Sequence, residues 1–266
     1  MLIKADAAQL EWRIKVFLAQ DKIAIAEILD PTRDIHQENK EVFKLPNRTI
    51  AKNFLYRMIF ADAFGEQGPK GPAYAYVNDP NFSPTSTSIK FWTAVIERFF
   101  EKYPQIYQHS VSLIKEGCER GFIQSPSGRV YRYSPYTKRN GEIDWPRTQM
   151  LNHIVQGFSA DVMVLARRII YKNWDKSLGL LINTVHDDIE ADVPNNPGTI
   201  FGVACLMEDS AEYIPEEAKK WFDINLNVPM EFECKFGMNL HESSMRKFNR
   251  NTFSEDFKKY NENNNH

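Results

Sequence analysis

Three acidic residues lie at points where short apolar segments end or turn. Asp6 follows the mostly apolar segment 2–5, and Asp187 and Asp188 lie at the centre of the alternating segment 180–193. An acidic residue at a strand end is usually a turn former, so either site alone is weak evidence. On adjacent strands of one sheet, these carboxylates would lie together, as hard cations such as Mg²⁺ require. Two such ions would activate an attacking hydroxyl and stabilise a leaving pyrophosphate.

The segment 48–60 contains a complementary row of cationic and aromatic residues. Arg48, Lys52 and Tyr56 are spaced four and four, and Phe60 continues the row, so a helix would place all of them on one face. One interpretation is an amphipathic helix with two cations on its solvated side. The other is a triphosphate clamp, because Arg binds phosphate oxygens bidentately, Lys supplies a point charge, and an aromatic ring stacks on sugar or base.

A second basic run has aromatic residues interleaved with its cations. Such a run is typical of a solvated loop, and it is also a candidate for contact with nucleic-acid phosphates. Its cations are Arg129, Arg132, Lys138 and Arg139, and its aromatic residues are Tyr131, Tyr133 and Tyr136.

The rest of the pattern predicts the elements that position these residues. Residues 2–6 are typical of a short buried strand, and alternation about a turn predicts hairpins at 122–133 and 180–193. Gly, Pro, Asn, Ser and Thr predict an extended loop at 65–88, and polar composition predicts a frayed tail after about residue 249. Helical periodicity predicts helices at 10–18, 34–43, 48–64, 89–102 and 105–118, and one long helix or two helices at 147–171.

Composition limits the class of protein. The chain has 266 residues, of which 42% are apolar, enough for one substantial core or two small ones. Its three cysteines have no disulfide or zinc spacing, and no stretch approaches a membrane span or a signal peptide. We therefore expect a soluble cytoplasmic protein with no membrane partner. The net charge is −2, so any contact with phosphates must come from local clusters.

Three motifs in order give the sequence a specific resemblance to the polymerase half of family A DNA polymerases, the group that includes bacterial DNA polymerase I. Shorter matches in the intervening segments support the same register. The motifs are Asp6-Ala-Ala-Gln-Leu-Glu-Trp-Arg13, then Arg48-x₃-Lys52-x₃-Tyr56-x₃-Phe60, then Val185-His-Asp-Asp188. The shorter matches are Asp34-Ile-His36, Phe99-x₃-Tyr103-Pro104, Gly128-Arg129 and Asn152-x₃-Gln156-Gly157.

The resemblance implies a catalytic centre with two Mg²⁺ ions. Asp6 and Asp187 would bind both metals, and Asp188 would be an accessory carboxylate. Arg48 and Lys52 would bind the triphosphate of a deoxynucleotide, and Lys52 would act as a general acid toward the leaving pyrophosphate.

The resemblance also implies further contacts with the incoming nucleotide. His36 would reach its phosphates, Gln9 would help to bind it, and Tyr56 would pack on the deoxyribose. A Tyr at this position suggests that dideoxynucleotides are accepted readily. Glu11 would block a ribose 2′-hydroxyl, and Phe60 would stack on a base.

Other residues would contact primer–template DNA. Arg13, Asn152 and Gln156 would contact the duplex near the primer end, His186 would contact the primer terminus, and Arg129 would bind the DNA as well.

The sequence departs from the family pattern at several positions. Phe60 and Ala61 stand where the family usually has Tyr and Gly, so a hydroxyl hydrogen bond is lost and fidelity is expected to differ. Asp188 replaces a longer Glu, which weakens its case as a metal ligand. Arg147 lies one residue away from the spacing expected for a duplex-contacting Arg, and we assign it no role. The loop at 65–88 has no clear counterpart.

The expected fold is α+β, with an antiparallel palm sheet packed on helices and an inserted, mostly helical fingers subdomain. The palm would comprise 1–45 and 146–266, and the fingers 46–145. The first motif lies at the start of the sequence, so we expect the thumb and any 3′–5′ exonuclease to be absent. A separate polypeptide would supply the thumb, as in a split polymerase of a phage acting in the cytoplasm of an infected bacterial host.

Two alternatives stay open. A single-subunit RNA polymerase shares the palm and a His-Asp motif, although Glu11 argues against it because a ribose gate would exclude its substrate. A non-catalytic DNA-binding remnant or assembly subunit is the other. The joint presence of Asp6, Asp187, Arg48 and Lys52 argues against such decay.

Overall fold

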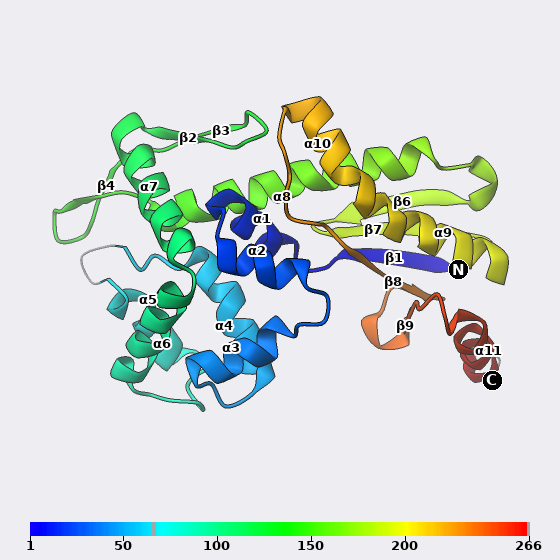
Figure 1. Cartoon of the computed structure of the whole chain (residues 1–266), viewed down its shortest axis with the longest axis horizontal. Helices are drawn as coiled ribbons and strands as arrows, with labels where there is room; N and C mark the ends of the chain where they lie inside the picture. Colours follow the sequence, from blue (N-terminus) through cyan, green and yellow to red (C-terminus); the bar gives the residue numbers. More distant parts are fainter. Residues whose placement is uncertain (65–67, 265–266) are drawn as a thin grey trace. The chain divides into compact units, whose positions relative to one another are not determined.

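The structure is a computed structural model that describes residues 1–64 and 68–264. The chain forms two compact units, one of residues 1–10 with 159–266 and one of residues 11–158. The first unit contains an antiparallel sheet packed on helices, and the second is mostly helical, so the fold is α+β as predicted (Figure 1). The helical unit includes residues 11–45 and 146–158, which the predicted bounds place in the palm. The palm and fingers bounds themselves stay a prediction.

The sheet of the first unit is built around its first strand. β1 (Leu2–Ala7) pairs with β7 (Asp188–Asp192) on one side and β8 (Phe232–Gly237) on the other, both antiparallel. β6 (Leu180–Val185) and β9 (Arg246–Lys247) complete the strand order β6-β7-β1-β8-β9. The predicted strand and the 180–193 hairpin are therefore confirmed. Along β1, alternate residues from Ile3 are buried, so Lys4 and Asp6 lie together on the other face.

The helices account for most of the rest of the chain. The predicted helices near 10, 35, 90, 105 and 147 and the 122–133 hairpin are confirmed. The helices are α1 (Leu10–Ala19), α2 (Lys22–Leu29), α3 (Ile35–Phe43), α4 (Arg48–Phe60), α5 (Lys70–Asn78), α6 (Ile89–Lys102), α7 (Pro104–Arg120), α8 (Arg147–Lys172), α9 (Pro197–Asp209), α10 (Ile214–Phe222) and α11 (Phe253–Asn264). The small strands are β2 (Phe122–Gln124) with β3 (Val130–Arg132), and β4 (Tyr136–Thr137) with β5 (Ile143–Asp144).

The segment after residue 249 was predicted to fray, and that prediction was wrong. It forms α11, in which Phe253 and Tyr260 are buried, and both rings pack against Phe236 of β8 with ring centroids 5.4 and 5.5 Å away. The spacing 253, 257 and 260 is a helical apolar stripe, which the surrounding polar residues obscure. This stripe anchors the C-terminal helix to the sheet.

The second unit has an aromatic core. Phe54 of α4 contacts both Tyr76 and Trp92, with ring centroids 5.5 and 6.3 Å away, and all three rings are buried. Tyr76 belongs to α5, so the predicted extended loop at 65–88 is wrong for residues 70–78, whereas residues 79–88 lie outside helices and strands as predicted. Residues 65–67 lie outside the described residues. Pro72 is compatible with α5 because it lies in the first turn, where backbone N–H groups have no intrahelical partner.

α4 ends at Phe60, earlier than the predicted 64. Ala61 is extended, and the Asp62 carboxylate accepts a hydrogen bond from the backbone N–H of Phe64. The same carboxylate binds Arg147 Nε at 2.9 Å, and Arg147 also pairs with Asp144 at 2.5 Å. Arg147, which has no predicted role, therefore fixes the segment that follows α4 to the start of α8.

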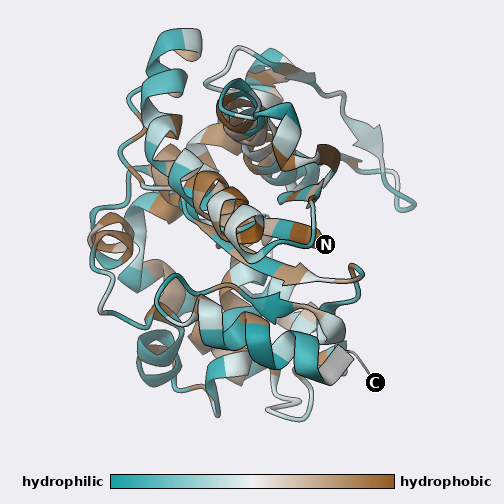
Figure 2. Cartoon of the chain, turned by 90° about the vertical axis from the view of Figure 1, so that its right-hand side faces the viewer, coloured by the Kyte–Doolittle hydropathy of each residue, from teal (hydrophilic) through white to brown (hydrophobic). Residues whose placement is uncertain are grey.

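Helices with one buried face contribute to both cores. Figure 2 shows hydrophobic and hydrophilic residues next to each other along single helices. In α4, for example, the buried residues are Ala51, Phe54, Leu55, Met58 and Ile59. Within residues 1–64 and 68–264, none of the helices combines the length and the apolar character needed to cross a membrane.

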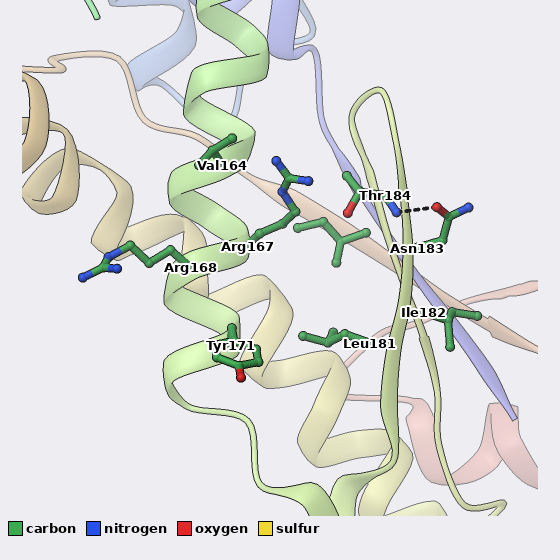
Figure 3. Close-up of a pocket in the computed structure, with 9 residues that line it drawn as sticks. Val164, Arg167, Arg168, Tyr171, Leu181, Ile182, Asn183 and Thr184 are labelled. Atoms are coloured by element: carbon green, nitrogen blue, oxygen red, sulfur yellow. Dashed lines mark hydrogen bonds between the residues drawn. The ribbon is translucent and has the colours of Figure 1, made fainter.

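Strand β6 forms one edge of the sheet. A groove of about 650 Å³ lies between it and the C-terminal half of α8, lined by Arg167, Tyr171, Leu181 and Thr184 among others (Figure 3). Ile182 of β6 is 46% exposed. This open edge lies on the strand that leads into the His186-Asp187 turn.

Lys15 is a buried cation whose titration should be visible in the stability of the protein. It is fully buried in α1, donates a hydrogen bond to Ser110 Oγ at 2.8 Å, and burial lowers its pKa from 10.5 to about 7. Above pH 7 the unfolded chain retains a proton that the folded chain has lost, so raising the pH opposes unfolding. We expect this group to raise the free energy of unfolding by up to about 1.4 kcal/mol per pH unit between pH 7 and 9.

The measurement is urea unfolding across that pH range for the wild type and for Lys15→Met. The variant lacks the titrating group, so the difference between the two free energies should change steadily with pH. Parallel pH profiles for the two proteins would show that Lys15 titrates normally in the folded state.

Candidate active site

Asp6, Asp187 and Asp188 form one carboxylate cluster. One oxygen of each side chain lies within 4.8 Å of the others. The register of the sheet brings this about, because Asp6 pairs with Asp188 across β1 and β7. Residues His186 and Asp187 form the two-residue turn between β6 and β7, with His186 at φ 54°, and the Ala7 N–H donates to the Asp187 carbonyl at 3.0 Å. Residues far apart in the sequence thus meet at one end of two strands.

The cluster concentrates negative charge in a partly buried place. Burial, together with the charges of Asp187 and Asp188, raises the pKa of Asp6 from 3.8 to about 6. Lys4 Nζ forms an ion pair with Asp188 Oδ2 at 2.7 Å. The hydrogen bond that Lys4 donates to Asp188 raises the pKa of Lys4. One lysine therefore offsets part of the charge of three carboxylates.

These residues fit a divalent metal ion. The other carboxylate oxygen of Asp188, Oδ1, is buried and has no hydrogen-bond partner within the described residues. A buried acceptor without a donor is costly, and a hard cation would satisfy it while relieving the repulsion among the carboxylates. The donor set consists of oxygens only, which suits Mg²⁺ better than softer metals.

The predicted row on α4 lies on one exposed face of the helical unit. Arg48 and Lys52 are exposed, and Tyr56 and Phe60 are half-buried, while the opposite face of α4 is buried. Lys52 Nζ lies 5.9 Å from the centroid of the Tyr56 ring. Asn47 caps the N-terminus of α4 by accepting from Ile50 N–H, which starts the helix at Arg48. The row can therefore meet a ligand from solvent.

Asp34 positions the first residue of this row, and His36 lies beside its third residue. Asp34 caps α3 through Oδ1, which accepts from the N–H groups of His36 and Gln37, and its Oδ2 accepts from Arg48 Nε at 2.7 Å. The His36 ring lies 6.2 Å from that of Tyr56. Burial, with a further contribution from Arg48, lowers the pKa of His36 to about 4. His36 is therefore neutral at pH 7 and would meet phosphate as a hydrogen-bond donor rather than as a cation.

The predicted DNA-contacting residues of α8 and of the 122–133 hairpin lie in the helical unit. Asn152 is half-buried with an unpartnered Oδ1 among the described residues, and Gln156 is exposed one turn later. Arg129 is exposed beside the hairpin turn. Asn152 and Gln156 lie four residues apart, so they share a face of the helix.

The remaining predicted residues are divided between the units. Gln9 lies in the first unit at φ 54°, and His186 is exposed there at the hairpin turn. Glu11 and Arg13 lie on α1 in the second unit, where Glu11 is half-buried and Arg13 is only 6% exposed. Arg13 also has a partner within the chain, which makes it a weaker candidate for contact with DNA than the sequence implied.

The sequence pattern alone did not identify three contributors to these sites. No role was predicted for Lys4, although its spacing of two from Asp6 places both residues on one face of a strand. Asp34 belongs to one of the shorter matches, but its pairing with Arg48 was not predicted. β8, the second neighbour of β1, had no predicted element, although Phe232, Cys234 and Phe236 alternate with charged residues in its sequence.

Comparisons of the sequence with known proteins agree with this arrangement. The profile of DNA polymerase family A matches residues 1–242. DNA polymerase I of Pseudomonas aeruginosa is 26% identical over 260 residues, which cover 91% of this chain and 25% of that protein. The thermostable DNA polymerase I of Thermus aquaticus is 23% identical over 246 residues, covering 89% of this chain and 26% of that protein. The chain thus spans about a quarter of the length of these relatives.

A solved structure shares the fold. It is the POL domain of Pol1 from M. smegmatis in complex with DNA primer-template and dNTP, with a TM-score of 0.65 and 18% identity. The match covers 89% of this chain and 39% of that one. Because the family profile extends over most of the sequence, and over all three motifs that position the carboxylate cluster and the α4 row, the chain belongs to DNA polymerase family A.

Proposed function

We propose that this chain adds deoxynucleotides to the 3′-hydroxyl of a primer under the direction of a DNA template. The observation that supports this most strongly is the cluster of Asp6, Asp187 and Asp188, in which Asp188 Oδ1 is buried without a donor among the described residues. Membership of the family and the relatives named DNA polymerase I support the same reaction. Primer–template DNA and dNTPs would be the ligands.

Asp6 and Asp187 would hold two Mg²⁺ ions, and Asp188 would assist them while paired with Lys4. When bound, the two ions would activate the primer hydroxyl and neutralise the charge that develops on the pyrophosphate. Bond formation between the primer O3′ and the α-phosphorus breaks the bond to the pyrophosphate. The carboxylates would thus fix the position of the reacting phosphate.

The α4 row would bind the same nucleotide from the helical unit. Arg48 and Lys52 would bind its triphosphate, and Lys52 would donate a proton to the leaving pyrophosphate. Tyr56 and Phe60 would pack on the sugar and base. A neutral His36 would donate a hydrogen bond to a phosphate oxygen. Binding of the correct nucleotide would draw the row and the carboxylates together, an induced-fit step.

The choice of sugar tests this assignment against an RNA polymerase. Glu11 would exclude a ribose 2′-hydroxyl, so deoxynucleotides should be incorporated at least about a hundredfold more efficiently than ribonucleotides. Single-nucleotide extension of a labelled primer measures both, with Glu11→Ala as the variant that should accept ribonucleotides. Equal use of the two sugars by the wild type would contradict the DNA assignment.

The separate thumb-bearing polypeptide stays a prediction, and the same assay addresses it. Extension should be measured with the chain alone and with the polypeptide encoded by the reading frame immediately upstream. A gain in extension on addition of that polypeptide supports a split polymerase. Binding of DNA without extension in either arm would favour a non-catalytic remnant.

A further inference from the structure

Gly157 follows Gln156, a predicted DNA-contact residue, and is in very close contact with the hairpin formed by β2 and β3. A Cβ atom built on Gly157 would lie 1.5 Å from the Tyr131 hydroxyl oxygen and 2.7 Å from Tyr131 Cζ. No side chain other than hydrogen leaves room for Tyr131 in this position. Gly157 lies inside α8, where glycine lowers helix stability, so its presence calls for a local reason.

Three further contacts, all with His153, hold the hairpin to the same stripe of α8. The His153 ring stacks with Tyr133 at a centroid distance of 5.8 Å, and the Tyr133 hydroxyl is hydrogen-bonded to His153 Nδ1 at 3.1 Å. The Tyr131 ring lies 5.4 Å from the same imidazole. Because His153 and Gly157 are four residues apart, the two tyrosines lie along one line of the helix. We call Tyr131, Tyr133, His153 and Gly157 the aromatic clasp.

The clasp lies beside the predicted DNA-contact residues. Asn152 and Gln156 form the neighbouring stripe, each directly before a clasp residue of α8. At the tip of the hairpin, the turn closes through hydrogen bonds from Ser125 N–H to the Arg129 carbonyl and from Gly128 N–H to the Ser125 carbonyl. Arg129 and Arg132 are exposed on this hairpin. All of these residues belong to the helical unit.

We propose that the aromatic clasp is a positioning device for the DNA duplex. It fixes the hairpin that contains Arg129 and Arg132 against α8, so that these cations and the Asn152–Gln156 stripe contact the same DNA in one geometry. Gly157 leaves room for the Tyr131 side chain and does not itself contact the DNA. This inference rests on the proposed function, because it presumes that Asn152 and Gln156 face a duplex.

A double-mutant cycle between positions 131 and 157 tests the clasp. Gly157→Ala should weaken binding of a fluorescein-labelled primer–template duplex about fivefold to tenfold, because Tyr131 must leave its place and the hairpin shifts. In a Tyr131→Val background the same Ala should change the affinity less than about twofold, because the clash is gone. Tyr131→Phe removes the atom at 1.5 Å and should give an intermediate effect.

A second measurement tests, in the absence of DNA, whether the clasp holds the hairpin. Amide hydrogen exchange of residues 129–133 should accelerate when Gly157→Ala is made with Tyr131 present, and should be unchanged when it is made in the Tyr131→Val background. Thermal unfolding of each variant by circular dichroism identifies any variant that fails to fold. In that case the DNA affinity and hydrogen exchange of the Tyr131→Val/Gly157→Ala protein decide whether Gly157 acts through Tyr131.

Several results would overturn the proposal. An equal loss of DNA affinity from Gly157→Ala in both backgrounds would mean that the glycine acts on the DNA or on the helix itself. Exchange that changes without any change in affinity would mean that the clasp holds the hairpin but positions no DNA contact. A wild-type chain without measurable DNA affinity would instead contradict the proposed function, and hydrogen exchange would still show whether the clasp exists.

Discussion

Asp187→Ala is expected to lower the rate of primer extension by at least about three orders of magnitude. The substitution removes one of the two carboxylates that would hold the two ions, and Asp6 and Asp188 alone would supply too little negative charge to bind both. Rapid-quench measurement of single-nucleotide incorporation at saturating dNTP gives the rate. The affinity for primer–template DNA should change little, because the predicted DNA-contact residues of the helical unit are untouched.

Asp192 provides a matched control on the same hairpin. It lies at the far end of β7, its side chain is 57% exposed, and its near partner is the N-terminal amine. Asp192→Asn should therefore extend primers at close to the wild-type rate. Titration with Mn²⁺ by calorimetry should show binding to the wild type and to Asp192→Asn but weaker binding to Asp187→Ala. Equal metal binding by all three proteins would place the metal site elsewhere.

Lys52→Ala is expected to lower the rate of nucleotide incorporation by about a hundredfold to ten-thousandfold, the range typical of a lost general acid. The measured quantity is the maximal single-turnover rate, obtained together with the apparent dissociation constant for dNTP. Since Lys52 would also contact the triphosphate, the dissociation constant should rise as well. Arg48→Ala should raise that constant and leave the maximal rate less affected, because Arg48 would bind the phosphates without transferring a proton.

An exposed lysine of the same unit controls for the loss of charge. The Lys115 side chain on α7 is 72% exposed and makes a long i,i+4 pair with Glu119. Lys115→Ala should leave both constants unchanged. If Lys52→Ala raised the dissociation constant alone and left the maximal rate intact, Lys52 would be a phosphate contact and not an acid.

The sequence predicted the elements of the site better than their neighbours. β1, the 180–193 hairpin and α4 follow from period-2 and period-3.6 patterns within a few residues of Asp6, Asp187 and Arg48. The meeting of Asp6 with Asp188, however, depends on pairing between strands from distant parts of the sequence, which no local pattern encodes. The resemblance to a family supplied that long-range information.

The errors have a common physical cause. α5 and α11 were missed because their polar, Gly and Pro residues are typical of loops and tails, whereas a few buried rings hold them in place. Tyr76 packs against Trp92 with ring centroids 4.8 Å apart, and Phe253 packs against Phe236. Tertiary packing outweighs weak local propensity in such short helices. The phage origin, the partner polypeptide and the host location depend on no contact in the structure and stay predictions.

The most direct test of the account is whether a labelled primer–template acquires the one deoxynucleotide that its template specifies. The assay uses the wild-type chain, alone and with the upstream-encoded polypeptide, in Mg²⁺ and in EDTA. We predict incorporation of the complementary dNTP in Mg²⁺, none in EDTA, and none with Asp6→Ala under either condition. Absence of incorporation in every Mg²⁺ arm, or equal incorporation by Asp6→Ala, would contradict the central claim that the carboxylate cluster is the catalytic centre of a DNA polymerase.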